Sequence, residues 1–254
     1  MGDQATLTFL GSAAAVPSVG HDNVFLAVEG SQSTLMIDCG GSPTLKLQLS
    51  GIEPTQLDCV LFTHRHPDHM YGFPILMLNL WLLGYRRALQ VVGEAEGVRA
   101  AKGLLDIFHA ADWPGFVPPH YHQVPVVPEA VLLDLADFLV TASPAEHLVP
   151  CLALKILNKG TGRVVVYSSD TAPSQSVVRL SRGADVLIHE ATGESEGHSS
   201  PAEAGTVAQE AGVSKLFLVH YPAFGTDLNV WREGAERTFS GPVELARDYG
   251  VIEF

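Results

Sequence analysis

Apolar residues occur along the chain mainly in short runs, separated by turns rich in Gly, Ser, Asp and Asn. Short apolar or alternating runs bounded by such turns are typical of β-strands. They predict strands at residues 5–10, 24–28, 34–37, 57–62, 89–92, 131–135, 138–141, 152–157, 164–167, 186–189 and 216–219. Helical spacing and helix-start signals predict helices at residues 43–49, 73–83, 97–110, 173–182 and 201–210.

Two regions fit these patterns less well. Residues 112–128 contain five prolines, too many for a regular element, and we interpret them as the connection between two halves. A C-terminal helical region is expected after residue 219, broken at Gly241-Pro242. The alternation of strands and helices predicts one α/β domain over residues 1–254, an αββα sandwich of two mixed β-sheets flanked by helices, with halves of about 1–125 and 126–254.

Composition narrows the class of protein. Of the 254 residues, 46% are hydrophobic and 17% are charged, which favours a folded chain with a sizeable core. The net charge of −13 and the lack of a basic stripe exclude nucleic-acid binding by charge alone. No segment is long and apolar enough to span a membrane. Three dispersed cysteines and an N-terminus without secretory features predict a reduced, cytoplasmic protein.

The segment T-H-R-H-P-D-H at residues 63–69 carries the strongest chemical signal. Three imidazoles and a carboxylate so close together are hard to explain by packing, because protonated imidazoles repel and each polar group needs a partner. Metal binding removes both problems. We expect His64 and His66 to face one ion, and Asp68 and His69 a second. This donor chemistry suits zinc, with manganese or iron as competitors.

The H-x-H-x-D-H signature resembles that of the metallo-β-lactamase superfamily. Further segments are similar, in order, to the motifs of its ribonuclease Z branch: G-S-A-A-A-V-P at 11–17, M-I-D-C-G at 36–40, E-H-L-V-P at 146–150, Y-S-S-D-T at 167–171, and H-E-A-T at 189–192 followed by H-S-S at 198–200. This resemblance covers nearly the whole chain. It implies the metallo-β-lactamase fold and a pair of divalent metal ions.

The resemblance also implies the remaining ligands and the catalytic residues. His147 joins the first ion, His220 joins the second, and Asp170 bridges them. Asp68 orients or deprotonates the attacking water. His198, oriented by Glu190, protonates the leaving oxygen. The sequence S-P-A-E at 200–203 independently predicts that a helix begins just after His198, with its positive end available to an anion.

Two further histidines, His120 and His122, alternate along a strand-like segment and could bind a metal together. No other donor is spaced to join them, and prolines surround them. We therefore interpret them as residues that line the connection between the halves.

The reaction implied by the resemblance is hydrolysis of a phosphodiester by hydroxide activated between two metal ions. Processing enzymes of the ribonuclease Z branch carry a long arm for precursor tRNA between the positions of His147 and Asp170, where only 22 residues lie here. We therefore expect a broad phosphodiesterase acting on a small cyclic or aryl phosphodiester, or on an RNA 3′ end. The alternatives are a hydrolase of another ester (an arylsulfatase, lactone or thioester hydrolase) on the same fold, and a non-enzymatic metal-bound scaffold.

A second copy of the chain is a further expected partner. The apolar segment 73–83 offers a surface for it, and members of the family often form homodimers.

Overall fold

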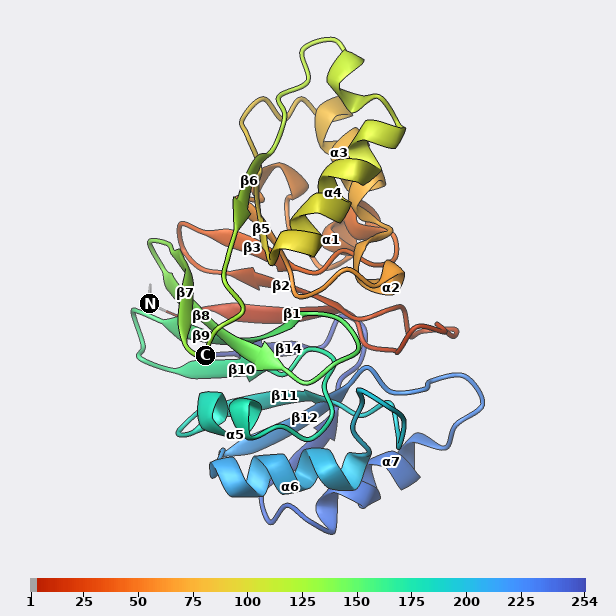
Figure 1. Ribbon diagram of the computed structural model, residues 1–254, viewed down its shortest axis with the longest axis vertical. Helices are drawn as coiled ribbons and strands as arrows, with labels where there is room; N and C mark the ends of the chain where they lie inside the picture. The colour runs from red at the N-terminus through yellow and green to blue at the C-terminus, as the bar shows by residue number, and fades with distance from the viewer. Residues whose placement is uncertain (1–3) are drawn as a thin grey trace.

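The computed structural model describes residues 4–254 and contains two seven-stranded sheets packed face to face (Figure 1). The first sheet has the order β14-β1-β2-β3-β4-β5-β6. Its strands are β1 (Thr6–Gly11), β2 (Phe25–Glu29), β3 (Thr34–Ile37), β4 (Cys59–Phe62), β5 (Gln90–Gly93), β6 (His120–Gln123) and β14 (Val251–Glu253).

The second sheet has the order β13-β12-β11-β10-β9-β8-β7. Its strands are β7 (Ala130–Asp134), β8 (Phe138–Ala145), β9 (Cys151–Asn158), β10 (Val164–Tyr167), β11 (Val186–Glu190), β12 (Lys215–Val219) and β13 (Val243–Leu245). Each sheet is mixed. In the first, β3 to β6 pair in parallel and the other pairs are antiparallel; in the second, β10 to β13 pair in parallel.

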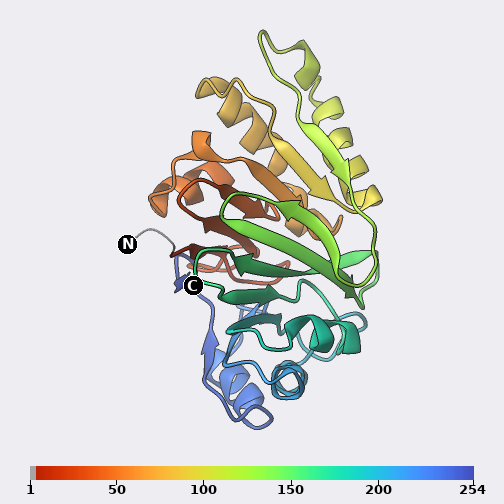
Figure 2. The same cartoon turned by 90° about the vertical axis from the view of Figure 1, so that its left-hand side faces the viewer.

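Helices cover the outer face of each sheet. The first sheet carries α1 (Pro43–Leu49), α2 (Pro67–Met70), α3 (Phe73–Leu82) and α4 (Ala95–Ile107), with short 3₁₀ turns at Pro54–Gln56 and Ala110–Asp112. The second carries α5 (Gln175–Ser181), α6 (Pro201–Ala211) and α7 (Leu228–Glu236). Figure 2 shows the same layers from the side. The predicted αββα sandwich is confirmed.

The core has three apolar layers, as this architecture requires. One lies between the sheets and includes Leu26, Leu35, Ile156 and Ile188. The other two lie between each sheet and its helices. Strands that are covered on both faces must be apolar on both sides, which explains why the central strands read as continuous apolar runs.

Two sequence predictions about secondary structure were wrong. Residues 120–123 form β6, an edge strand parallel to β5, although we predicted only an irregular connection. The prolines flank this strand, and an edge position tolerates them there. The region beyond Gly241 forms β13 and β14 and not helix. Three-residue strands are too short to leave a clear period in the sequence.

The C-terminal strand β14 returns to the first sheet and pairs antiparallel with β1. Backbone hydrogen bonds in both directions join Ala5 and Phe254. Cys39, Cys59 and Cys151 are buried and form no disulfide. Within residues 4–254, no helix combines the length and the apolarity that crossing a membrane requires.

Candidate metal centre

The seven predicted metal donors lie together at one edge of the sandwich, where strands of both sheets end. Residues 63–69 follow β4 of the first sheet, and α2 begins within them. His147, Asp170 and His220 follow β8, β10 and β12 of the second sheet. These three strands run in the same direction, so their carboxyl ends meet at one edge. Two sheets thus supply donors to one place from segments distant in sequence.

The first group of donors consists of His64, His66, His147 and Asp170. The Nδ1 atom of His66 lies 3.1 Å from His64 Nε2 and 3.0 Å from His147 Nε2. Ligands at about 2.0–2.1 Å from a tetrahedral zinc ion are separated by roughly 3.3 Å. The three imidazoles therefore have the spacing of ligands around one ion.

Asp68, His69 and His220 form the second group, and Asp170 lies between the two. The Oδ2 atom of Asp170 is 3.5 Å from the Nε2 atoms of both His69 and His220. It is also 3.8 Å from His64 Nε2 and 3.9 Å from His147 Nε2. One carboxylate oxygen therefore faces imidazole nitrogens of both groups, which is the position of a bridging ligand.

The backbone turns sharply where the strands deliver these donors. His220 has φ of +50° and Ser169, just before Asp170, has φ of +53°. Non-glycine residues seldom adopt this left-handed conformation, which costs free energy that surrounding contacts must offset. One such contact is the hydrogen bond from His220 N to Ser12 O, 2.8 Å long. The turns direct both side chains out of their sheet and into the site.

A buried carboxylate, Asp38, orients two of the imidazoles. It accepts hydrogen bonds from Thr63 N (2.8 Å) and Thr63 Oγ1 (2.9 Å), and its Oδ2 lies 2.8 Å from His69 Nδ1. Because the Thr63 hydroxyl donates to Asp38, it accepts from His64 Nδ1 at 3.0 Å. Both imidazoles thus carry a proton on Nδ1 and turn Nε2 toward the site. Such outer partners fix the tautomer of a metal ligand.

The other two Nε2 donors are held in the same way. His147 Nδ1 donates to Gly197 O at 2.8 Å, and His220 Nδ1 lies 2.8 Å from Thr192 Oγ1. Gly197 has φ of +77°, and a Cβ atom there would lie 3.0 Å from His147 Nδ1. Glycine is therefore required for the close approach of this loop to the imidazole.

The site keeps three imidazoles neutral, which is the form that binds metal. Burial lowers the pKa of His64 well below its usual value, and the neighbouring imidazoles add to this effect. Burial likewise lowers the pKa of His66 and of His147. These three side chains are therefore available as ligands at neutral pH.

The carboxylates of the site are ionised. Burial by itself would raise the pKa of Asp170, but its electrostatic interactions with His220 and His69 outweigh burial and hold the pKa well below the usual value. Burial also opposes ionisation of Asp68, and its hydrogen bond to His220 and the charge of His69 outweigh that effect. The site therefore holds negative charge where a cation is needed.

Unpartnered buried atoms provide a test of whether these residues fit a metal. Among residues 4–254, six buried side-chain atoms lack a hydrogen-bond partner, and two of them, His69 Nε2 and Asp170 Oδ1, lie in this site. Buried polar atoms are nearly always satisfied, so each exception needs a cause. Together with the donor spacing, these two atoms fit a pair of divalent cations.

His198 and Glu190 form a pair beside the donors, and His198 also forms a third group of possible metal donors with Asp170 and His220. His198 Nδ1 lies 2.9 Å from Oε1 of the buried Glu190, and the His198 ring stacks on that of His220 at 5.7 Å. Burial alone would lower the pKa of His198, but the hydrogen bond and charge of Glu190 raise it above the usual value. The predicted helix start is confirmed, because α6 begins at Pro201 with a full capping box.

A pocket of about 420 Å³ opens over the donors and combines a polar floor with apolar walls. The floor contains donors of both groups together with His198. The apolar walls consist of Ala14, Ala15, Val16, Pro222 and Phe224.

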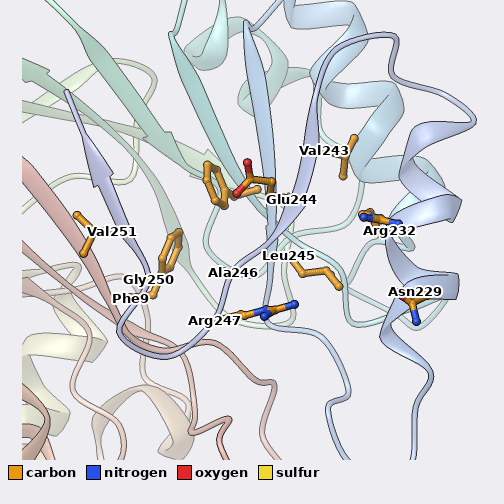
Figure 3. Close-up of a pocket in the computed structure, with 11 residues that line it drawn as sticks. Phe9, Asn229, Arg232, Val243, Glu244, Leu245, Ala246, Arg247, Gly250 and Val251 are labelled. Atoms are coloured by element: carbon orange, nitrogen blue, oxygen red, sulfur yellow. The ribbon is translucent and has the colours of Figure 1, made fainter. Parts of the chain in front are cut away.

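A second cleft of about 370 Å³ shares none of these residues (Figure 3). It lies beside β13 and α7, and its lining includes Phe9, Phe217, Arg232 and Arg247. It contains no histidine and therefore none of the chemistry of the first pocket.

Other histidines lie away from the donors. His120 and His122 are on β6, and each contacts the side chain of Gln90. Neither belongs to a group of possible metal donors within residues 4–254. Sequence reasoning assigned no role to Asp38, Thr192 or Gly197. The M-I-D-C-G motif could have pointed to Asp38 and the H-E-A-T motif to Thr192, whereas nothing local distinguishes Gly197.

The chain is similar to proteins of one known family. The family described as the beta-lactamase superfamily domain matches residues 34–221. A protein named ribonuclease Z from Methanothermobacter thermautotrophicus is 27% identical, with 97% of this chain and 96% of that protein covered.

Solved structures are similar over the whole fold. The metallo-β-lactamase fold protein YhfI from Bacillus subtilis has a TM-score of 0.82 at 25% identity, with 99% of this chain and 100% of that chain covered. The short form of human tRNase Z has a TM-score of 0.78 at 23% identity, with 97% and 98% covered.

Proposed function

The chain belongs to the β-lactamase superfamily, and we propose that it is a metal-dependent hydrolase of phosphodiester bonds, similar to ribonuclease Z. The observation that carries the proposal is the position of Asp170, whose Oδ2 atom lies within 3.9 Å of four imidazole nitrogens. The name of the relatives supports an RNA or other phosphodiester substrate.

In this proposal the seven donors hold two divalent ions. The first would bind His64, His66 and His147, the second would bind Asp68, His69 and His220, and Asp170 would bridge them. When bound, such ions lower the pKa of a water molecule and neutralise charge on phosphoryl oxygens. Five imidazoles and two carboxylates favour zinc, with manganese and iron as the alternatives.

Asp68 and His198 carry out the proton transfers of the proposed reaction. Asp68, itself an ionised donor of the second group, orients or deprotonates the attacking water. His198 donates its Nδ1 proton to Glu190 in a hydrogen bond, so a protonated His198 carries a second proton on Nε2. The raised pKa of His198 favours that protonated form, which protonates the departing oxygen.

Location and assembly complete the proposal. Three free buried thiols suit a reducing compartment such as the cytoplasm. The exposed residues Ile75, Leu82 and Leu83 lie on and just beyond α3 and support a homodimer through this helix.

The test combines metal analysis with a substrate panel. We expect about two divalent ions per chain, and hydrolysis of bis(p-nitrophenyl) phosphate, cyclic nucleotides or a precursor tRNA faster than that of sulfate, acyl, lactone or thioester substrates. Loaded protein that hydrolyses another ester class faster than any phosphodiester would contradict the proposal. Loaded protein that hydrolyses nothing across the panel would favour a scaffold.

A further inference from the structure

The apolar side of the donor pocket is built from one loop of each sheet. Val16 lies on the loop that follows β1, and Phe224 lies on the loop that follows β12. The loops are joined by hydrogen bonds from Ala14 N to Tyr221 O (3.0 Å) and from His220 N to Ser12 O (2.8 Å). They therefore form one continuous surface, here called the apolar wall, consisting of Ala14, Ala15, Val16, Pro222 and Phe224.

The two largest side chains of the apolar wall are left in solvent. Val16 is 63% exposed and Phe224 is 73% exposed. A single exposed apolar residue is common, but these two lie on paired loops and line the same pocket as His66, Asp68 and His220. Apolar surface continuous with a polar reaction centre is the usual composition of a small-molecule site.

The pocket contains no lysine or arginine among its lining residues. The basic residue of the His-rich segment, Arg65, forms an ion pair with Glu96. A polyanionic backbone thus meets no free basic side chain in the pocket, in a chain whose net charge is −13. A single phosphodiester needs only the proposed metal ions, and its remaining ester group meets apolar surface.

We propose that the apolar wall binds an aromatic ester group of the substrate, with the ring of Phe224 stacked on it. This inference rests on the proposed function and names its substrate class, a small phosphodiester that bears an aryl group or a nucleobase. Phe224 is then the specificity-determining residue. The volume of about 420 Å³ suits such a molecule.

Equilibrium binding tests the apolar wall without turnover. Phenylphosphonate and methylphosphonate carry the same anionic group and differ in the aromatic ring. We expect the metal-loaded protein to bind phenylphosphonate about tenfold more tightly by titration calorimetry, because its ring can stack on an aromatic side chain. Phe224→Ala should abolish the preference and Phe224→Trp should keep it. The control is Phe108→Ala. Phe108 is an exposed phenylalanine just beyond α4 that lines a different pocket, beside α3, so its loss should leave the preference unchanged.

Two binding results would overturn the inference. One is equal affinity of the unaltered protein for the two phosphonates. The other is a preference that survives in Phe224→Ala. Metal content is measured on every variant, so that a change in the floor of the pocket is not mistaken for a change in the apolar wall.

Turnover separates this inference from the proposed function. The 2′,3′-cyclic phosphate of adenosine and that of 1-O-methylribose present the same scissile bond with and without a base. We expect Phe224→Ala to raise KM about tenfold for the first alone, with kcat nearly unchanged. Hydrolysis of both substrates with equal KM, or of precursor tRNA only, would contradict the binding of an aromatic ester group. The proposed phosphodiesterase activity would still stand. If the protein hydrolyses no phosphodiester but still prefers phenylphosphonate, the proposed phosphodiesterase activity is contradicted. The binding of an aromatic group by the apolar wall would still stand.

Discussion

The floor and the apolar wall of the donor pocket are built in opposite ways. Floor residues such as Asp170 and His220 are buried, emerge from strand ends and are constrained by several neighbours. Val16 and Phe224 in the wall are exposed and belong to loops. The difference separates two tasks. The sandwich fixes the chemistry at its strand ends, while the loops select the substrate and can vary without disturbing the donors.

The comparison predicts that the floor is intolerant of change, and Asp170 should show the largest effect. Asp170→Asn removes the charge that faces four imidazoles. We expect metal affinity to fall by more than about 100-fold, beyond the range for outer partners of a ligand, and activity to disappear with it. Elemental analysis and phosphodiester hydrolysis measure the two losses. Full metal content in a folded Asp170→Asn protein would contradict the bridging position.

His198 lies on the floor but is not proposed as a ligand, so its loss should separate metal from turnover. We expect His198→Ala to retain its metal and to slow kcat by about 10²-fold or more, the scale of general acid catalysis. Steady-state kinetics and metal analysis on the same sample provide the test. Turnover equal to that of the unaltered protein would remove the role assigned to this histidine.

A substitution at Asp38 tests whether residues that hydrogen-bond the donors affect metal binding. Asp38→Asn weakens the orientation of His69 and Thr63, and we expect metal affinity to fall by about 10–100-fold. Asp58→Asn is a matched control, because Asp58 is a carboxylate at the opposite end of β4 that bonds Thr34 N. Competition with a chromogenic chelator measures affinity. Equal affinities of the two variants would mean that Asp38 serves only the fold.

Glu190 should act through the pH dependence of His198. Glu190 raises the pKa of His198, so His198 loses its proton at a higher pH than an ordinary histidine. Glu190→Gln removes the negative charge and lowers that pKa, and the alkaline limb of kcat/KM should move to lower pH. Metal content serves as the control, because a substitution that displaced the donors would reduce it. If the alkaline limb stays at the same pH in Glu190→Gln, a group other than His198 causes it.

The smallest effect is expected in the apolar wall outside Phe224. Val16→Ser removes part of one apolar contact, and we expect KM for an aryl phosphodiester to rise by only about threefold, in line with the loss of one or two buried methyl groups. Metal content and kcat should not change. A large loss of metal in Val16→Ser would break the distinction between floor and wall.

Local patterns explain what the sequence predicted. The central strands read as apolar runs because they are covered on both faces, and the His-rich segment lies within seven consecutive residues. By contrast, β6 and β14 are edge strands of three or four residues whose pairing is set by distant partners. The hydrogen bonds of Thr192 and Gly197 to the histidines also join segments far apart. No period in a single segment encodes such contacts.

The return of β14 to the edge of β1 has a consequence for synthesis of the protein. Translation delivers β1 first, yet the sheet that contains it is complete only when Phe254 has left the ribosome. His220 also emerges late. A nascent chain therefore carries the early histidines long before it can complete the proposed metal site. Chains released before His220 would lack both the edge strand and this donor, and so could not complete the second proposed group of metal donors.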